Sequence, residues 1–262
     1  MLDLFNTPTP QNANYQEFFG SGVLLTPTVF NWVKPRGASM VRIMLIGAGA
    51  GGRNGGVSAG GAGGGSGAVT QWLGPAMFIP DVLRITVGAG GAAAAAGGNT
   101  TVIYQQKDGT GYTLLTANGA ASATAGAASA ATPFSSSGLY SSIAGQDGAN
   151  QNISSTASAT TFLSGGAGGS GVQGTAGPTV AVNFGYPTSV AATANSTNPG
   201  QDGFFFTQPV LVGRAGGGGA TTESAGGNGG QGGIGCGGGG AGEDALTGGG
   251  RGGDGAAFIW AW

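Results

Sequence analysis

The chain has 262 residues, of which 61 are glycine, and its eight basic and ten acidic residues leave a net charge of −2. Disordered chains combine few large apolar residues with a high net charge, and this chain lacks the charge. Histidine is absent and no basic cluster occurs, which argues against acid–base catalysis, metal binding and nucleic-acid binding. The composition therefore favours an ordered, non-enzymatic protein that needs no cofactor and whose glycine-rich backbone is packed.

Residues 1–25 are polar with scattered apolar side chains, and Pro8 and Pro10 disfavour a helix there. We expect an extended arm that docks on a neighbouring subunit; a strand packed on its own domain is the alternative. The start has no basic region followed by a long apolar stretch, and no apolar run approaches 18 residues. We therefore expect synthesis in the cytoplasm and no insertion into a membrane.

Short apolar or alternating segments predict strands throughout the first half of the chain. Residues 41–46 are apolar on both faces, as in a central strand, and residues 83–87 alternate. The segment Lys107-Asp108-Gly109 separates two such runs and predicts a hairpin. No segment has helical periodicity over three turns, so the fold is expected to be all-β. The predicted strands are 29–33, 41–46, 69–73, 83–87, 100–104, 112–116 and 258–262, with weaker candidates at 180–184 and 209–212.

Glycine is concentrated in two blocks, with 12 of the residues from 47 to 67 and 23 of those from 213 to 255. Between the blocks, residues 118–163 contain only five glycines and are rich in alanine, serine and threonine. This contrast predicts a β and glycine-rich framework over 26–117, an insertion over 118–212, and a closing glycine-rich segment with a strand over 213–262.

The second glycine block has a period of three. The triplets at 226–228, 229–231 and 232–234 each begin with two glycines, and the next begins with Gly235. Three residues per turn is the repeat of the polyproline-II helix, which has no internal hydrogen bonds. Without side chains, such helices can pack closely and bond laterally. We therefore expect a sandwich-like antiparallel framework with packed polyglycine-II-like segments and long loops, in which Gly226, Gly229, Gly232 and Gly235 are structural.

Other patterns were weighed against this packing role. Residues 47–52 match the dinucleotide-binding glycine pattern, but that site needs a helix behind the glycines and an acid about 20 residues later. Residues 249–254 match the start of a calcium-binding β-roll repeat, but such sites need tandem copies. The repeated Gly-Gln-Asp-Gly at 145–148 and 200–203 predicts turns. Cys236 stands alone and is expected to be a buried spacer.

Several aromatic side chains lie in or beside the predicted insertion. They could form a small core under long loops, or a binding surface that contacts sugars or protein loops. We take them as candidate receptor-binding residues: Phe134, Tyr140, Phe162, Tyr186, Phe204, Phe205 and Phe206.

Three blocks resemble the glycine-rich domains of phage tail and fibre proteins. The first is Trp32, Pro35 and residues 41–49; the second is residues 83–91 followed by 98–101; the third is residues 252–255 before the terminal apolar strand. The resemblance spans residues 28–104 and 213–262. The family includes the receptor-binding tip adhesins of T-even-type phages, in which packed polyglycine helices carry variable loops that touch the host surface.

The resemblance implies a bacteriophage virion protein, a spike or tail-fibre adhesin that mediates attachment to the host cell. The expected partners are other virion proteins, held through the arm at 1–25, and a host receptor, either a glycan or an outer-membrane protein. Assembly as a homo-oligomer is expected. The alternative is a purely structural virion subunit, such as a capsid spike, decoration or tail-tip protein, in which residues 134–206 would be buried against neighbours.

Overall fold

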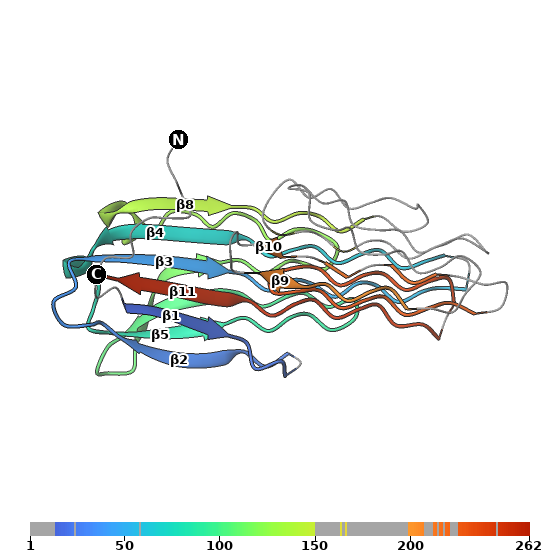
Figure 1. Cartoon of the computed structure of the whole chain (residues 1–262), viewed down its shortest axis with the longest axis horizontal. Coiled ribbons are helices and arrows are strands. Elements are labelled where there is room, and N and C mark those ends of the chain that lie inside the picture. Colours follow the sequence, from blue (N-terminus) through green and yellow to red (C-terminus); the bar gives the residue numbers. More distant parts are fainter. Residues whose placement is uncertain are drawn as a thin grey trace.

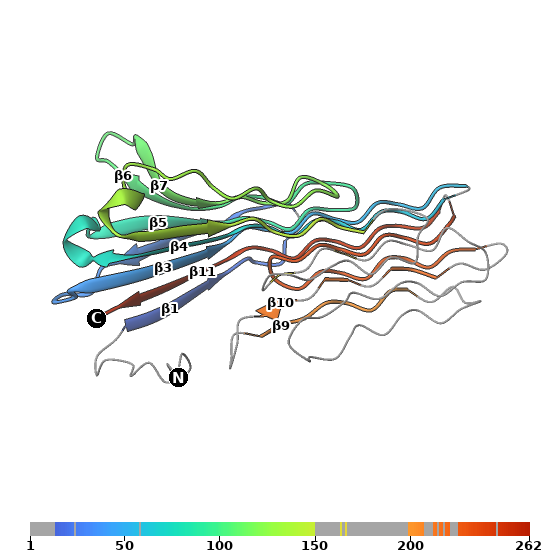
Figure 2. The same ribbon diagram turned by 90° about the horizontal axis from the view of Figure 1, so that it is seen from above.

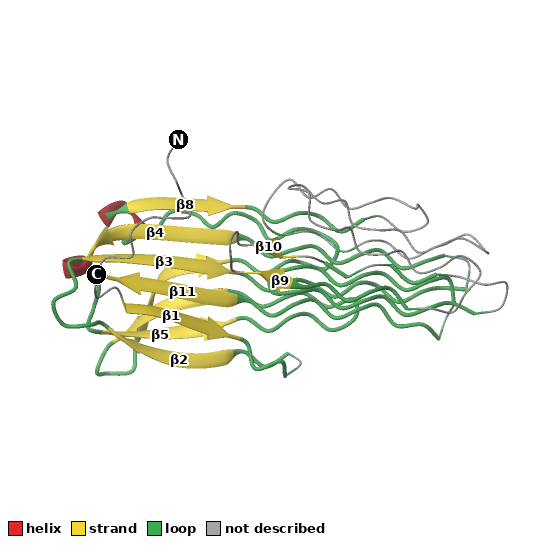
Figure 3. Cartoon of the chain, viewed as in Figure 1, coloured by secondary structure: helices red, strands yellow, loops and turns green. Residues whose placement is uncertain are grey.

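A computed structural model describes residues 14–23, 25–57, 59–149, 163, 166, 199–206, 212–213, 215–216, 218–220, 225–244 and 246–262. These parts of the chain form an elongated molecule with β-sheets at one end and long glycine-rich runs, lying side by side, at the other (Figure 1). The backbone of these runs is neither β-strand nor α-helix, and Figure 3 draws it as loop. The fold therefore has two structural parts that differ in their backbone conformation.

The described strands are antiparallel and there is no α-helix among the described residues, which confirms the all-β prediction. One sheet has the order β1-β11-β3-β4-β8, a second has the order β2-β5-β6-β7, and β9 pairs with β10. The elements are β1 (Asn14–Phe19), β2 (Thr28–Val33), β3 (Met40–Ile46), β4 (Val69–Pro75), the 3₁₀-helix η1 (Ala76–Phe78), β5 (Val82–Val87), β6 (Thr100–Gln105), β7 (Gly111–Ala117), the 3₁₀-helix η2 (Ser135–Ser137), β8 (Leu139–Ile143), β9 (Phe205–Phe206), β10 (Val212–Gly213) and β11 (Ala256–Ala261).

Strands β2 to β7 and β11 lie where the sequence predicts strands, and β6 and β7 form the predicted hairpin. Two strands of the five-stranded sheet were not predicted. Strand β1 lies in the expected arm and pairs with β11 of the same chain, so the alternative of a strand on its own domain holds for residues 14–19. Strand β8 lies in the expected insertion and pairs with β4. Residues 1–13, 180–184 and 209–211 lie outside the described residues.

The two large sheets pack face to face as a sandwich (Figure 2). Alternate side chains point into the space between them because successive residues of a strand face opposite ways. The main core includes Trp32 from β2, Trp72 from β4, Ile85 from β5 and Ile259 from β11, each with no exposed area. This core fixes the relative position of the sheets, from which the glycine-rich runs extend.

A second apolar cluster lies on the other face of the five-stranded sheet. In β3, Val41, Ile43 and Leu45 point into the main core, whereas Met44 and Ile46 join this second cluster. Phe258 of β11 belongs to it and is 1% exposed. Strand β3 is therefore apolar on both faces because each face packs against a different layer. The short pair β9 and β10 lies on the side of the second cluster (Figure 2).

The glycine-rich runs are joined by lateral backbone hydrogen bonds with a period of three. Along residues 47–53, successive N–H groups point to three different neighbouring runs, and each direction recurs at every third residue. Donors at 47, 50 and 53 reach carbonyls at 68, 65 and 62 (2.9, 3.0 and 2.7 Å), donors at 48 and 51 reach 98 and 95 (both 3.0 Å), and donors at 49 and 52 reach 253 and 250 (2.9 and 2.8 Å). This arrangement confirms packed polyglycine-II-like helices. We call this set of laterally bonded glycine-rich runs the bundle.

The four glycines predicted to be structural lie in this bundle. The N–H groups of Gly229, Gly232 and Gly235 donate in turn to the carbonyls of residues 248, 251 and 254 at 3.0, 2.8 and 2.8 Å. Gly226 lies close to the backbone of residues 242–243. A Cβ atom on Gly229 would lie 1.9 Å from the carbonyl oxygen of Gly239, far inside any contact distance. Glycine is thus required because neighbouring backbones occupy the space of a side chain.

We expect Gly229→Ala to destabilise the protein strongly, because its methyl group would separate two packed backbones; overpacking typically costs about 1–3 kcal/mol. The matched control is Gly248→Ala in the neighbouring run, where the nearest atom to a new Cβ, Oδ1 of Asn228, is 3.9 Å away. Thermal and denaturant unfolding of both variants measures the difference. Equal stability of the two variants would show that the bundle is not closely packed.

Candidate functional site

The turns that connect the runs of the bundle lie at the end farthest from the sheets. Residues 47–53 continue β3, and their hydrogen-bond partners run backward from 68 to 62, so the turn that joins the two runs lies at the far end. At about 3.1 Å per residue, this run spans roughly 20 Å. Residues 248–255 lead into β11 in the same way. We call the described residues of the two turns, 53–57, 59–60, 242–244 and 246–248, the tip.

The two tip turns are bonded to each other. The N–H of Gly55 donates to the carbonyl of Thr247 at 3.3 Å, and the N–H of Gly249 donates to Oδ1 of Asn54 at 3.1 Å. Within the second turn, the hydroxyl of Thr247 donates to the carbonyls of Gly242 and Asp244, each at 2.8 Å. These contacts hold the two turns in a defined arrangement.

Each tip turn exposes one apolar side chain. Val57 is 82% exposed and Leu246 is 92% exposed, although neither is needed for a turn. Arg53 is also exposed, and Glu243 and Asp244 are half-buried, so charged groups lie beside the apolar ones. Val57 and Leu246 were not predicted from the sequence because single apolar residues in a glycine-rich segment form no periodic pattern. The only signal is their isolation between glycine runs.

Phe134 and Tyr140, two of the predicted receptor-binding residues, lie in the sandwich and not at the tip. The ring of Phe134 stacks on Trp72 with centroids 4.9 Å apart, and both residues pack against the main core. The hydroxyl of Tyr140 donates to the carbonyl of Ser129 at 2.9 Å. Both aromatic side chains therefore contribute to the packing of the sandwich and do not form the separate small core under long loops that was the alternative; their part in receptor binding stays a prediction.

The structure does not bring Phe204 and Phe205 together with Phe134 and Tyr140. Phe205 packs against the second cluster, on the opposite face of the five-stranded sheet from the main core. Both Phe204 and Phe205 line a groove of about 330 Å³ beside the runs at 231–234 and 251–254. Phe206 pairs with Val212 in the β9–β10 ladder. Phe162 and Tyr186 lie outside the described residues.

The glycines at 47–52 do not precede a helix, as a dinucleotide site requires, but belong to the bundle. The two Gly-Gln-Asp-Gly segments also lie in the bundle, so their prediction as turns is wrong. In both segments the glycine N–H groups donate laterally to other runs: Gly145 and Gly148 to carbonyls at 126 and 123, and Gly200 and Gly203 to carbonyls at 228 and 231. The two aspartates play the same part, because the side chain of each accepts a hydrogen bond from the backbone of another segment: Asp147 from the N–H of Ala125 and Asp202 from the N–H of Gln231, each at 2.7 Å.

The carboxylate of Asp254, in the segment resembling a calcium repeat, is already occupied. Oδ1 accepts from the N–H of Gly90 at 2.7 Å and from Arg251, and Oδ2 accepts from the N–H of Gly22 at 3.0 Å. Arg251 also donates to the carbonyl of Gly22 at 2.7 Å. The pair therefore ties the segment after β1 to the bundle. Among the described residues, no three acidic, cysteine or histidine side chains are placed to hold a metal.

Comparison with known proteins identifies a family for most of the chain. The profile of a family described as a glycine-rich domain matches residues 25–262. The chain belongs to this family. The match to the glycine-rich domain begins after β1 and covers the other strands of both sheets, the bundle and the tip. A comparison with curated proteins found no significant match. None of the helices in the described part of the glycine-rich domain is long and apolar enough to cross a membrane.

We expect EDTA to leave the unfolding temperature unchanged, because protein donors fill the Asp254 carboxylate, the one acid in the calcium-like segment. Differential scanning calorimetry with and without excess calcium provides the measurement. A fall of several degrees on chelation, reversed by calcium, would mean that an ion holds the bundle together.

Proposed function

We propose that this protein is a bacteriophage virion protein, a spike or tail-fibre adhesin, that attaches the particle to the host cell surface. The observation that carries the proposal is the tip, where Val57 and Leu246 are exposed on two turns that are bonded to each other. Recognition residues commonly lie on loops held by a rigid scaffold. Exposed apolar side chains beside charged ones are typical of contact surfaces.

The backbone of the bundle supports this role. Its lateral hydrogen bonds fix the backbone, and its many glycines mean that few side chains can rearrange. The tip can therefore contact a receptor with little loss of conformational entropy. The sequence resembles glycine-rich phage virion proteins and, more distantly, the tip adhesins of T-even-type phages, in which loops on packed polyglycine helices touch the host surface. The receptor on this proposal is a surface glycan or an outer-membrane protein.

An apolar patch at the sandwich end offers a surface for anchoring to the particle. Val33 pairs with Val82 across β2 and β5, and these residues are 62% and 52% exposed. Nearby, Met77 and Phe78 of η1 are 81% and 49% exposed. We propose that other virion proteins, or further copies in a homo-oligomer, cover this patch, with residues 1–25 contributing. The protein would then act in the virion after synthesis in the host cytoplasm, without enzymatic activity.

The same patch favours the second candidate, a structural virion subunit without receptor contact. The two functions depend on opposite ends of the molecule. An attachment protein needs a free tip, whereas a structural subunit needs only its contacts with neighbours. Mutations at the tip therefore separate them.

We expect the purified chain to inhibit phage adsorption to host cells, and the double variant Val57→Asp/Leu246→Asp to need at least about tenfold more protein for half-maximal inhibition, because it loses apolar contacts at the centre of the interface. Adsorption is measured by counting free phage after a fixed time.

The matched control is the double variant Val29→Asp/Tyr112→Asp, which places the same two charges on exposed apolar positions in the sandwich, outside the tip and outside the apolar patch. It should inhibit as well as the unchanged chain. No inhibition by the unchanged chain at saturating concentration would favour the structural subunit, and equal inhibition by the tip variant would remove the tip from recognition.

A further inference from the structure

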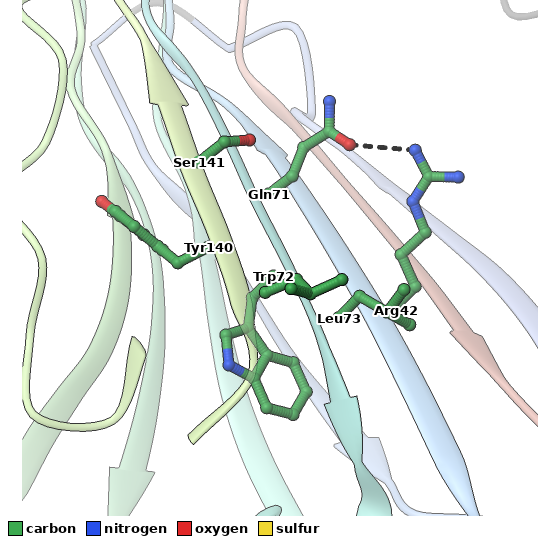
Figure 4. Close-up of a pocket in the computed structure, with 7 residues that line it drawn as sticks. Arg42, Gln71, Trp72, Leu73, Tyr140 and Ser141 are labelled. Atoms are coloured by element: carbon green, nitrogen blue, oxygen red, sulfur yellow. Dashed lines mark hydrogen bonds between the residues drawn. The ribbon is translucent and has the colours of Figure 1, made fainter. Parts of the chain in front are cut away.

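A groove of about 290 Å³ lies on the outer face of the five-stranded sheet, across β3, β4 and β8. Figure 4 shows that Arg42, Gln71 and Ser141 point to this face, whereas the rings of Trp72 and Tyr140 turn to the other side of the sheet. Leu73 and Leu139, which pair across β4 and β8, provide the apolar part of the lining. The groove lies among the strands, and the tip lies at the other end of the bundle.

The guanidinium of Arg42 is held in place but has no acidic partner within 4 Å in the part of the chain that the structure describes. Nη2 donates to Oε1 of Gln71 at 2.9 Å, and Cζ lies 5.0 Å from the ring centroid of Trp260. Trp260 of β11 pairs with Arg42 on β3 and with Tyr15 on β1, and its ring stacks on that of Tyr15 with centroids 5.0 Å apart. The ion pairs among the described residues are Lys34–Asp81 and Arg251–Asp254, so neither involves Arg42.

This arrangement favours a negatively charged ligand. Partial burial lowers the pKa of Arg42 because the charged form loses hydration, and no carboxylate in the described residues compensates. An arginine with a fixed side chain presents its remaining N–H groups as a planar fork that fits the two oxygens of a carboxylate. Because Arg42 is exposed overall, such a carboxylate can reach its remaining N–H groups.

The remaining lining fits a sugar ring better than a bare anion. The amide nitrogen of Gln71 and the hydroxyl of Ser141 can bond to sugar hydroxyls, while Leu73 and Leu139 can contact the apolar C–H face of a pyranose. Leu139 is 75% exposed, so its side chain is available to a ligand. We propose that this groove binds an acidic saccharide, with Arg42 on the sugar carboxylate. The proposal is independent of recognition at the tip.

The test is isothermal titration of the full chain with D-galacturonic acid and its linear trimer, and with D-galactose and acetate as neutral and sugar-free probes. We expect saturable binding of the acidic sugars and at least about tenfold weaker binding by Arg42→Gln, because a charge-assisted hydrogen-bond pair is lost. Binding should weaken as salt is added. Arg42→Lys, which keeps the charge but not the fork, should fall between.

Two further variants make the result specific. Arg36→Gln changes the net charge equally at an exposed arginine outside the groove and should bind like the unchanged chain. Leu139→Glu places a carboxylate at the exposed rim of the groove and should bind acidic sugars at least about tenfold more weakly by charge repulsion. Unfolding temperatures within about 2 °C of the unchanged chain would show that each variant is folded, as expected for exposed substitutions.

The proposal is overturned if no acidic sugar binds saturably, if galactose binds as well as galacturonic acid, or if acetate matches it. It is also overturned if Arg36→Gln weakens binding as much as Arg42→Gln. Sedimentation velocity provides the last check, because self-association abolished by Arg42→Gln would mean that a side-chain carboxylate of a second copy, and not a saccharide, occupies the groove.

Discussion

The structure depends on hydrogen bonds between bare backbones. In a sheet, each strand bonds to neighbours on two sides in one plane, whereas along residues 47–53 the N–H groups point to three different runs in turn. This is possible only where runs approach closely, as at Gly49, whose Cβ would lie 1.9 Å from the carbonyl of Cys236. The bundle therefore has an interior made of peptide groups, and close packing with satisfied polar groups takes the place of a large apolar core.

The sandwich and the bundle are continuous because strands lead into runs. Residues 47–53 continue β3, and residues 248–255 lead into β11, so the register of the sheet sets the register of the bundle. The apolar clusters on both faces of β3 hold this junction rigidly. As a result, the position of the tip is determined by packed strands at the opposite end, although the turns themselves contain few large side chains.

The positions of the strands could be predicted where the pattern is local. The alternation at 83–87 and the two-sided apolar run at 41–46 correspond to β5 and β3. Strand β8 was missed because Leu139–Ile143 contains two serines and lies at a sheet edge, where burial is incomplete and the apolar pattern is weak. Phe134 was assigned to a possible binding surface because sequence alone does not reveal the ring of Trp72 on which it stacks.

The sequence by itself determined that the chain is all-β, that its glycines are needed for the side chain they lack, and that a period of three governs residues 226–235. The first and third of these properties follow from patterns along the chain, namely side-chain alternation and the spacing of glycine. The second follows from composition, because only glycine leaves room for another backbone. Only the tertiary structure decided which runs are neighbours, that Val57 and Leu246 share the tip, and that Arg42 meets Gln71 across β3 and β4. Those contacts join residues far apart in sequence, and nothing local to either partner encodes the identity of the other.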